Sequence, residues 1–177
     1  MKVELEGHIH RMLKQGLISP SDAPNSCPVV LVTKPNGKTR MCVDFRRLNK
    51  VIVDCPVPLP SIQEIFDNFT IAEDNSNPTF IMSSLDMHEG FHQLLLHPDS
   101  RKYCTFSCHL GSFFYNRVPM GLKVSPFFFL RTVYAALSKC PGDTWQHLLC
   151  YMDDICLWTN SVSSHFHHLK VLFQRLR

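Results

Sequence analysis

Apolar residues recur at helical spacing at both ends of the chain. Residues 3–15 and residues 163–177 each carry such a stripe, and Gly16 follows the first of them. Residues three or four positions apart share one face of an α-helix, so each stripe predicts an amphipathic helix. The aligned residues are Leu5, Ile9, Met12 and Leu13 in the first stripe and Phe166, Leu169, Phe173 and Leu176 in the second.

Between these helices the pattern mainly predicts strands joined by short turns. Residues 27–45 predict two strands around Pro35-Asn36-Gly37, a composition typical of a hairpin turn. Residues 77–96 predict a strand that enters Asp86, a tight turn at Glu89-Gly90 and then a second strand. Further strands are expected in residues 102–108 and 112–118, which pair around residues 109–111, and in residues 145–158, which meet at Asp153-Asp154.

Two further helices are expected in the interior of the chain. Ser61-Ile62-Gln63-Glu64 has the spacing of a capping box and opens a short helix with Ile65, Phe66 and Phe69 on its apolar face. Ser125-Pro126 begins a second helix that runs to about Ser138, with proline in its first turn. Strands enclosed by helices at both ends, with no repeat or linker between them, predict one α+β unit.

Composition limits the class of protein. The chain has 177 residues, 45% of them hydrophobic, which suffices for the core of about one domain. The N-terminal residues lack the apolar segment of a secretory signal, and no apolar run approaches the ~20 residues that cross a bilayer. We therefore expect an intracellular protein, in the cytoplasm or the nucleus, that is neither secreted nor bound to a membrane.

The cysteines agree with this expectation. The eight cysteines stand singly along the chain, without a Cys-x-x-Cys pair. Cys104, Cys108 and His109 form the one grouping that resembles a metal site, and it lacks a second pair of ligands. Reduced, buried thiols are the better interpretation than zinc or disulfides.

Positive charge is concentrated in one segment. Residues 34–50 carry six Lys or Arg residues against the single acid Asp44, so the segment has a net charge of +5 in a chain of +3. Such a patch favours an anionic partner, namely phosphate or nucleic acid. A hairpin whose basic side chains merely face solvent is the alternative that charge alone leaves open.

Residues 148–158, LLCYMDDICLW, place Asp153 and Asp154 within an apolar run. Buried carboxylates are costly unless they are paired, protonated or bound to a cation. The pair is therefore either a turn that reaches solvent or part of a cation site. Asp86, which ends a second apolar strand, supplies a third carboxylate, and a few aspartates suffice for magnesium because Mg²⁺ keeps several waters.

Five segments together resemble the reverse transcriptases of retroviruses and gypsy-type retrotransposons. They occur in the family's order and cover nearly the whole chain. The segments are GLISPSDAPNSCPVVLVTKPNGKTRMCVDFRRLNKV, PVPLPSIQEIF, SLDMHEGFHQLLL, VPMGLKVSPFFF and YMDD. The resemblance implies an RNA-directed DNA polymerase that adds dNTPs to a primer 3′-hydroxyl on an RNA or DNA template.

The resemblance also implies a fold and its division along the chain. It is the fingers and palm of a right-hand polymerase, with an antiparallel palm sheet packed on helices and no thumb. Residues 1–177 would form one reverse transcriptase domain, a fragment in which residues 1–85 are mainly fingers with the start of the palm and residues 86–177 are mainly palm. Thumb, connection and ribonuclease H regions are expected in the full-length polyprotein rather than in this chain.

Site residues follow from the same resemblance. Asp86, Asp153 and Asp154 correspond to the catalytic triad and, with the backbone carbonyl of Met87, to the ligands of two Mg²⁺ ions, for which Mn²⁺ is an alternative. The nucleotide-binding positions are Lys34, Lys38, Arg40, Phe91, Met120 and Gly121. The primer and template positions are Tyr151, Met152, Arg46 and Lys50.

Individual roles are chemically reasonable for these residue types. Lys34 and Arg40 would grip the triphosphate from the fingers hairpin, with Lys38 as a helper, because arginine offers bidentate donors to phosphate. A bulky Phe91 would exclude a ribose 2′-hydroxyl; without the resemblance it would be an ordinary core aromatic. Gly121 would let the backbone approach its ligand closely.

Several residues are expected to be structural. Asp44 is predicted to partner local backbone or an arginine. Histidines of the last helix are expected on its solvent side, and a group of phenylalanines in the core. These are His165, His167 and His168, and Phe127, Phe128, Phe129 and Phe166, respectively.

Two alternatives to an active polymerase core stay open at this point. A retroelement remnant could keep the fold and bind nucleic acid without catalysis, although the complete set of aspartates with Lys34 and Arg40 argues against decay. An RNA-dependent RNA polymerase has the same kind of palm with metal-binding carboxylates, but it must accept the ribose 2′-hydroxyl, which Phe91 disfavours.

Overall fold

The computed structural model describes residues 2–33, 35, 37, 39–56, 61, 63 and 80–177. It contains two compact units, and each is assembled from two stretches of the chain. Unit 1 comprises Met1–Cys55 and Glu89–Ser125, and unit 2 comprises Pro56–His88 and Pro126–Arg177. The assignment of residues 1–85 mainly to fingers and 86–177 mainly to palm stays a prediction.

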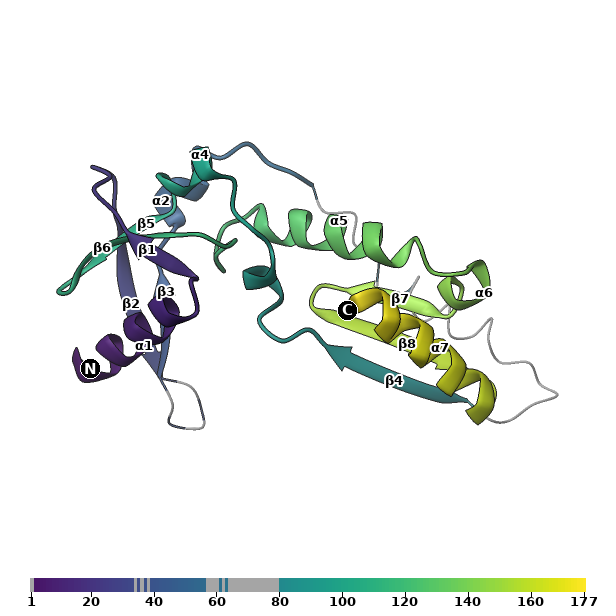
Figure 1. The fold of residues 1–177 in the computed structure, drawn as a ribbon. Helices are drawn as coiled ribbons and strands as arrows, with labels where there is room; N and C mark the ends of the chain where they lie inside the picture. Colours follow the sequence, from purple (N-terminus) through teal and green to yellow (C-terminus); the bar gives the residue numbers. More distant parts are fainter. Residues whose placement is uncertain are drawn as a thin grey trace. The chain divides into compact units, whose positions relative to one another are not determined.

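Unit 1 is a five-stranded sheet with a helix packed against it (Figure 1). The strand order is β1-β6-β5-β2-β3, in which β2 and β5 run parallel and the other neighbours are antiparallel. The predicted hairpins at residues 27–45 and 102–118 are both confirmed. The elements are α1 Lys2–Lys14, β1 Ile18–Pro20, β2 Cys27–Thr33, β3 Thr39–Val43, β5 Thr105–Cys108 and β6 Gly111–Tyr115.

The core of unit 1 lies between α1 and the sheet. Ile9 and Met12 of α1 are buried together with Phe106 and Tyr115 of the strands, as the helical spacing of residues 3–15 predicts. The Phe106 and Tyr115 rings lie 5.4 Å apart between centroids, a tilted aromatic contact. Apolar burial of this kind is the main stabilising contribution to such a unit.

Three short helices complete unit 1, and one of them corrects a prediction. They are α2 Arg46–Asn49, the 3₁₀ helix η1 Gly90–Gln93 and α4 Pro98–Arg101. A strand is predicted directly after Glu89-Gly90, but the chain forms η1 there because Glu89 adopts a left-handed backbone with φ 48°. Of the expected strand, Leu95 alone makes an isolated bridge, to Arg117.

Unit 2 is a three-stranded antiparallel sheet of order β4-β8-β7 with helices beside it (Figure 1). Its strands are β4 Ile81–Asp86, β7 Leu148–Tyr151 and β8 Asp154–Thr159. The predicted strand into Asp86 and the predicted pair of strands around Asp153 are confirmed. The helices are α5 Ser125–Leu137, which begins at the last residue of unit 1, α6 Gly142–Trp145 and α7 Val162–Leu176.

The last helix, α7, buries a different face from the one its phenylalanines indicate. Phe166 is 69% exposed and Phe173 is 53% exposed, whereas His165, His168 and Leu172 are buried. The expectation of solvent-facing histidines is wrong for His165 and His168, and Phe166 is not a core residue. Phe128, 44% exposed, is not a core residue either, while Phe129 is buried as expected.

Hydrogen bonds explain why imidazoles occupy the buried face of α7. His165 Nε2 lies 2.8 Å from Ser83 Oγ and its Nδ1 lies 2.9 Å from Thr159 Oγ1, so the side chain joins α7 to β4 and β8. His168 Nδ1 lies 2.9 Å from Thr144 Oγ1 of α6. Buried polar groups are tolerated when they are paired in this way.

The remaining expectations concern the thiols, membrane-spanning helices and the helix after Ser61. All eight cysteines are unpaired thiols, and burial raises the pKa of Cys104 and of Cys150 to about 12 in each case. Within the described ranges, every helix is too short or too polar to span a bilayer. Most of the helix predicted from Ser61 to Phe69 lies outside the described residues.

A candidate carboxylate catalytic site

The register of the unit 2 sheet brings Asp86, Asp154 and Tyr151 side by side. Asp86 at the end of β4 is paired with Asp154 at the start of β8, and Asp154 is in turn paired with Tyr151 of β7. Directly opposed residues of antiparallel strands point to the same face, with Cβ atoms about 4.5–5.5 Å apart. The two carboxylates and the phenol therefore share one face at one end of the sheet.

The alternation of the strands explains this placement. Ile155 and Cys150, the neighbours of Asp154 and Tyr151, point to the opposite face and are buried. Leu85, paired with Ile155, is half-buried on that same face. Because side chains alternate along a strand, burying these apolar residues directs Asp86 and Asp154 away from the apolar side.

Asp153 lies in the two-residue turn that joins β7 to β8. Met152, the other turn residue, has φ 51°, in the left-handed region that costs a non-glycine residue about 1–3 kcal/mol. The backbone N–H of Met87 donates to the carbonyl oxygen of Asp153 over 3.0 Å, which fixes the turn against the end of β4. This bond places the third carboxylate next to the other two.

The Asp153 carboxylate is poorly compensated within the protein. Its Oδ1 is buried and has no hydrogen-bond partner among the described residues. Burial, followed by the negative charges of Asp86 and Asp154, raises the pKa of Asp153 above its usual value. A half-buried carboxylate with an unpaired oxygen and two acidic neighbours fits a divalent cation, whose charge would offset all three.

The three aspartates do not converge as tightly as ligands of a single small ion. Among the described residues, three ligand atoms come within 4.8 Å of one another at Asp143, His167 and His168, a separate cluster of unit 2. Paired metal ions in such sites lie roughly 3.5–4 Å apart, and Mg²⁺ retains several waters. A spread of carboxylates is therefore compatible with that kind of site.

Arg40 and Met120, two predicted nucleotide-binding residues, are in contact in unit 1. Arg40 lies on β3 opposite Val32, and its Nη2 donates to Met120 Sδ over 2.6 Å. A thioether is a weak acceptor, so the guanidinium retains most of its capacity for a phosphate. Lys34 and Lys38 lie outside the described residues.

Gly121 has a conformational requirement of its own. Its φ is 95°, which L side chains rarely adopt, and a Cβ there would make ordinary contacts at 3.6 Å to Phe45 and 3.8 Å to the Val43 carbonyl. Asn49 holds the segment, since its Nδ2 donates to the Gly121 carbonyl over 2.8 Å and its Oδ1 accepts from the Lys123 N–H over 3.0 Å. Glycine is therefore needed here for backbone geometry, whatever it approaches.

Asn49 is a positioning residue that no pattern in the sequence singles out. It sits at the end of α2 within the basic segment, where a polar residue is unremarkable. Its partners are about 70 positions away along the chain, at separations of 72 and 74. A single sequence carries no signal for such a contact.

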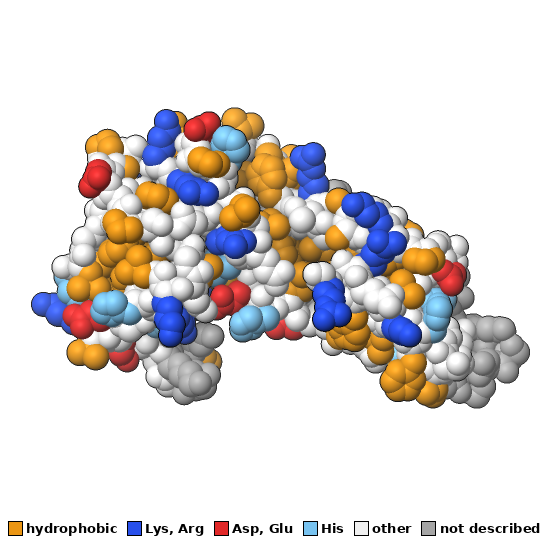
Figure 2. Space-filling view, in the orientation of Figure 1, with side chains coloured by type: hydrophobic (Ala, Val, Ile, Leu, Met, Phe, Trp, Pro, Cys, Tyr) orange, Lys and Arg blue, Asp and Glu red, His pale blue; other side chains and the backbone are white. Residues whose placement is uncertain are grey.

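The predicted primer and template residues differ in exposure and in whether an ion pair compensates their charge. Arg46 makes a forked ion pair with Asp44, with Nη2 2.6 Å from Oδ2, and this lowers the pKa of Asp44 to about 2. The expected arginine partner for Asp44 is thereby confirmed. Lys50 is exposed, as is Met152, while Tyr151 is half-buried. On the face shown in Figure 2, Lys and Arg side chains are spread over each unit rather than gathered in one patch.

Phe91 is half-buried in η1 of unit 1. Its neighbour His92 stacks on Tyr115 with ring centroids 6.3 Å apart, which anchors η1 to the sheet of that unit. Asp86, Asp153 and Asp154 belong to unit 2, whereas Arg40, Phe91, Met120 and Gly121 belong to unit 1. The structure thus brings together the aspartates as one group and Arg40 with Met120 as another.

Comparison with known proteins adds an independent line of support. A family model described as reverse transcriptase (RNA-dependent DNA polymerase) matches residues 32–177. The Tf2-3 transposon polyprotein of Schizosaccharomyces pombe is 31% identical over 173 residues, and the Tf2-7 polyprotein is 30% identical over 176 residues. Each match covers 98% of this chain and 12% of the polyprotein, so the chain spans about an eighth of those relatives.

Solved structures give the same result for the fold. The prototype foamy virus protease–reverse transcriptase, as a selenomethionine-labelled mutant, matches 99% of this chain and 22% of its own with a TM-score of 0.83 and 27% identity. The foamy viral enzyme in complex with double-stranded DNA matches with a TM-score of 0.80 and 26% identity, over 99% of this chain and 34% of that one. The predicted α+β fold is confirmed by these matches, and with the family model spanning most of its length the chain belongs to the reverse transcriptase (RNA-dependent DNA polymerase) family.

Proposed function

We propose that this chain is the catalytic core of a retroelement RNA-directed DNA polymerase, which transfers a nucleotide from a dNTP to a primer 3′-hydroxyl. The observation that carries the proposal is the carboxylate group of unit 2. Asp86 and Asp154 are directly opposed, and the turn before Asp154 holds Asp153 with an unpaired buried oxygen. Without a cation the three carboxylates repel one another, as is expected of a site that binds metal ions.

Asp86, Asp153 and Asp154, with the backbone carbonyl of Met87, would hold two Mg²⁺ ions, and Mn²⁺ would serve in their place. When bound, such ions supply charge stabilisation for the attacking and leaving oxygens of an in-line displacement. The protein's contribution is to fix the carboxylates by strand pairing and by the hydrogen bond from Met87 to Asp153. Preorganised groups need no rearrangement at the moment of reaction.

The incoming nucleotide would be bound by residues of unit 1. Arg40, together with Lys34 and Lys38, would contact the triphosphate, and Arg40 would exchange its weak Met120 acceptor for charged oxygens. Phe91 would exclude the ribose 2′-hydroxyl and so select deoxynucleotides. Met120 and Gly121 would line the nucleotide, with the Gly121 backbone held by Asn49.

The template and primer would contact Tyr151, Met152, Arg46 and Lys50. Nucleic acid is the partner class that the relatives support, because one matching foamy viral structure is a complex with double-stranded DNA. Arg46 is already paired with Asp44, so Lys50 would provide more of the phosphate attraction. Unpaired thiols throughout the chain support an intracellular location.

The test combines binding and extension by the 177-residue chain. Primer–template binding is titrated across salt, alongside extension of a DNA primer on an RNA template with magnesium. We expect weak binding with a shallow salt dependence, because few phosphate contacts release few counterions. Extension should be slow and distributive, because a primer–template held by few contacts dissociates between additions.

Two outcomes would contradict the proposal. Nucleic-acid binding without any extension, in a folded sample, would favour a non-catalytic retroelement remnant. Extension that is as fast in the Asp154→Asn variant as in the wild type would show that the carboxylate group is not the reactive centre. Asp99→Asn, an exposed aspartate on α4 of unit 1, is the matched control and should leave extension unchanged.

A further inference from the structure

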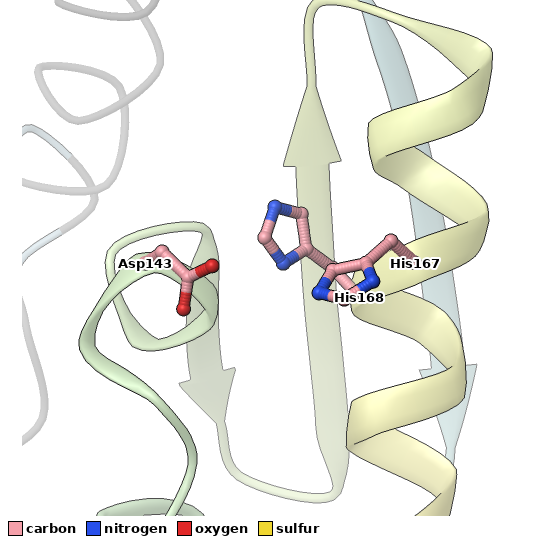
Figure 3. Close-up of side chains that lie close together, drawn as sticks. All are labelled: Asp143, His167 and His168. Carbon is pink, nitrogen blue, oxygen red and sulfur yellow. The ribbon is translucent and has the colours of Figure 1, made fainter.

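A second group of metal-ligating side chains lies in unit 2, apart from the catalytic aspartates in sequence. It consists of Asp143 on α6 and of His167 and His168 on α7. One ligand atom from each of the three lies within 4.8 Å of the other two. Figure 3 shows the Asp143 carboxylate facing the two imidazole rings across the space between α6 and α7.

Local structure holds the two helices in this arrangement. Thr144, the residue after Asp143, has its Oγ1 2.9 Å from His168 Nδ1 and is completely buried. The Asp143 Oδ1 accepts from the Thr144 N–H over 2.9 Å, which orients the carboxylate at the start of α6. These contacts fix two of the three side chains before any ion binds.

The state of His168 suits a metal ligand. One ring nitrogen, Nδ1, is already engaged by Thr144, and a hydrogen bond on one ring nitrogen is usual for metal-bound histidine. Burial, then the neighbouring His147, lowers the pKa of His168, which favours the neutral ring. Neutral imidazole is the form that coordinates metals.

An unpaired nitrogen beside the cluster is a separate indication. The His147 ring lies 5.0 Å from the His168 ring between centroids. His147 Nδ1 is buried and has no hydrogen-bond partner among the described residues. Buried nitrogens are seldom left unpaired, and a water held at an open coordination position would supply a donor to this one.

We propose that Asp143, His167 and His168 bind a transition-metal ion of the zinc class. Two imidazoles and a carboxylate are the ligands that Zn²⁺ takes in three-residue sites, whereas Mg²⁺ prefers oxygen alone. Ligand atoms around tetrahedral zinc lie roughly 3.3 Å apart, given Zn–N distances of about 2.0–2.1 Å. Asp143 and His167 are exposed and can move inward by the remaining distance, while the buried His168 stays in place.

Such an ion would act as a clamp between α6 and α7. These helices immediately precede β7 and follow β8, the two strands whose turn carries Asp153. His168 is already bonded to Thr144 of α6, so the ion would strengthen an existing contact rather than create a new arrangement. Its main effect should be on the stability of unit 2 rather than on chemistry.

The experiment uses the whole chain, reduced with a phosphine that does not bind metal tightly. Zinc is titrated calorimetrically, Co²⁺ binding is followed by visible absorption, and melting is measured with zinc and with chelator. With excess magnesium present to occupy the aspartates of the catalytic site, we expect one zinc ion per chain and, at about 100 times the dissociation constant, a melting temperature raised by roughly 5–10 °C. Asp143→Asn and His167→Asn should each weaken binding at least about 10-fold without unfolding the protein, since both residues are exposed.

The matched controls separate this site from other metal-binding groups. His10→Asn removes an exposed histidine of α1, and Asp154→Asn removes a catalytic carboxylate; neither should change zinc affinity. Unchanged affinity in both Asp143→Asn and His167→Asn would overturn the proposal. So would a Co²⁺ spectrum with thiolate charge-transfer bands, which would assign the ion to cysteine, or the absence of any zinc binding by the wild type.

Discussion

Replacing Asp153 by asparagine should stabilise the metal-free protein while removing its response to magnesium. The aspartate has a buried Oδ1 without a hydrogen-bond partner, and the charges of Asp86 and Asp154 add to the effect of burial in raising its pKa. Asparagine keeps the shape of the side chain and removes the charge. The same substitution leaves the cation site one carboxylate short.

The expected gain is small but measurable. The gain comes from removing a partly buried charge that Asp86 and Asp154 repel, because asparagine still places a polar atom at the buried position. We expect about 1 kcal/mol, since the rest of the side chain is partly exposed and screened. A gain of about 1 kcal/mol corresponds to roughly 2–4 °C in melting temperature for a chain of this size. Magnesium at about ten times its dissociation constant should stabilise the wild type by about 1.4 kcal/mol and the variant by less.

The pH dependence follows from the direction of the pKa shift. A carboxyl group whose pKa is raised in the folded state binds its proton more tightly when folded, so acid favours the native protein. The difference between Asp153→Asn and the wild type should therefore vanish below about pH 4, the usual pKa of aspartate, and grow as pH rises through the folded-state value.

The assay is thermal melting in chelator and in magnesium, at acid and neutral pH, for the wild type, Asp153→Asn and the exposed control Asp99→Asn. Refutation would be a variant that melts below the wild type in chelator at pH 7, since the carboxylate would then be a stabilising group. Equal magnesium responses in the wild type and in Asp153→Asn would also refute the reasoning, because Asp153 would not be a ligand.

Three further predictions follow from particular residues. Phe91→Val should admit ribonucleotides in primer extension while Phe166→Val, on an exposed residue of α7, should not; an unchanged preference would return Phe91 to a structural role. Gly121→Ala should lower the free energy of unfolding by about 1–3 kcal/mol because φ is 95°, whereas Gly7→Ala within α1 should raise it by about 0.5–1 kcal/mol. Denaturant unfolding measures both changes, and changes of the same sign would contradict the prediction. His165→Leu should cost about 2–3 kcal/mol by leaving the Ser83 and Thr159 hydroxyls without their imidazole partner, and a loss no larger than that of His10→Asn would contradict it.

The sequence predicts the sheets well because their apolar residues alternate and their turns have typical residues. Pro35 and Gly37 mark one hairpin, and the run from Leu148 to Trp158 marks another, so Asp153 and Asp154 are placed correctly at a turn. The pairing of Asp86 with Asp154 is a contact between distant segments that no local pattern predicts; the sequence indicates only that Asp86 ends an apolar strand.

The errors arise where tertiary contacts override a local pattern. Phe166 and Phe173 have helical spacing, yet α7 buries His165 and His168 because Ser83, Thr159 and Thr144 offer them hydroxyl partners. Histidine side chains occur both in protein cores and at surfaces, and the hydroxyl partners of His165 and His168 are not adjacent to them in sequence. The strand expected after Gly90 is replaced by η1, which follows the left-handed Glu89 and packs on the sheet through the stacking of His92 on Tyr115.

The most direct test of the central claim is single-turnover incorporation of one templated dNTP, with protein in excess over an RNA-templated DNA primer. Protein excess ensures that weak primer binding does not hide the chemical step. The wild type should extend the primer in magnesium, and Asp86→Asn, Asp153→Asn and Asp154→Asn should each abolish extension while remaining folded. Incorporation that persists in any of the three variants, or that proceeds equally well in chelator, would contradict the assignment of these carboxylates as the catalytic centre.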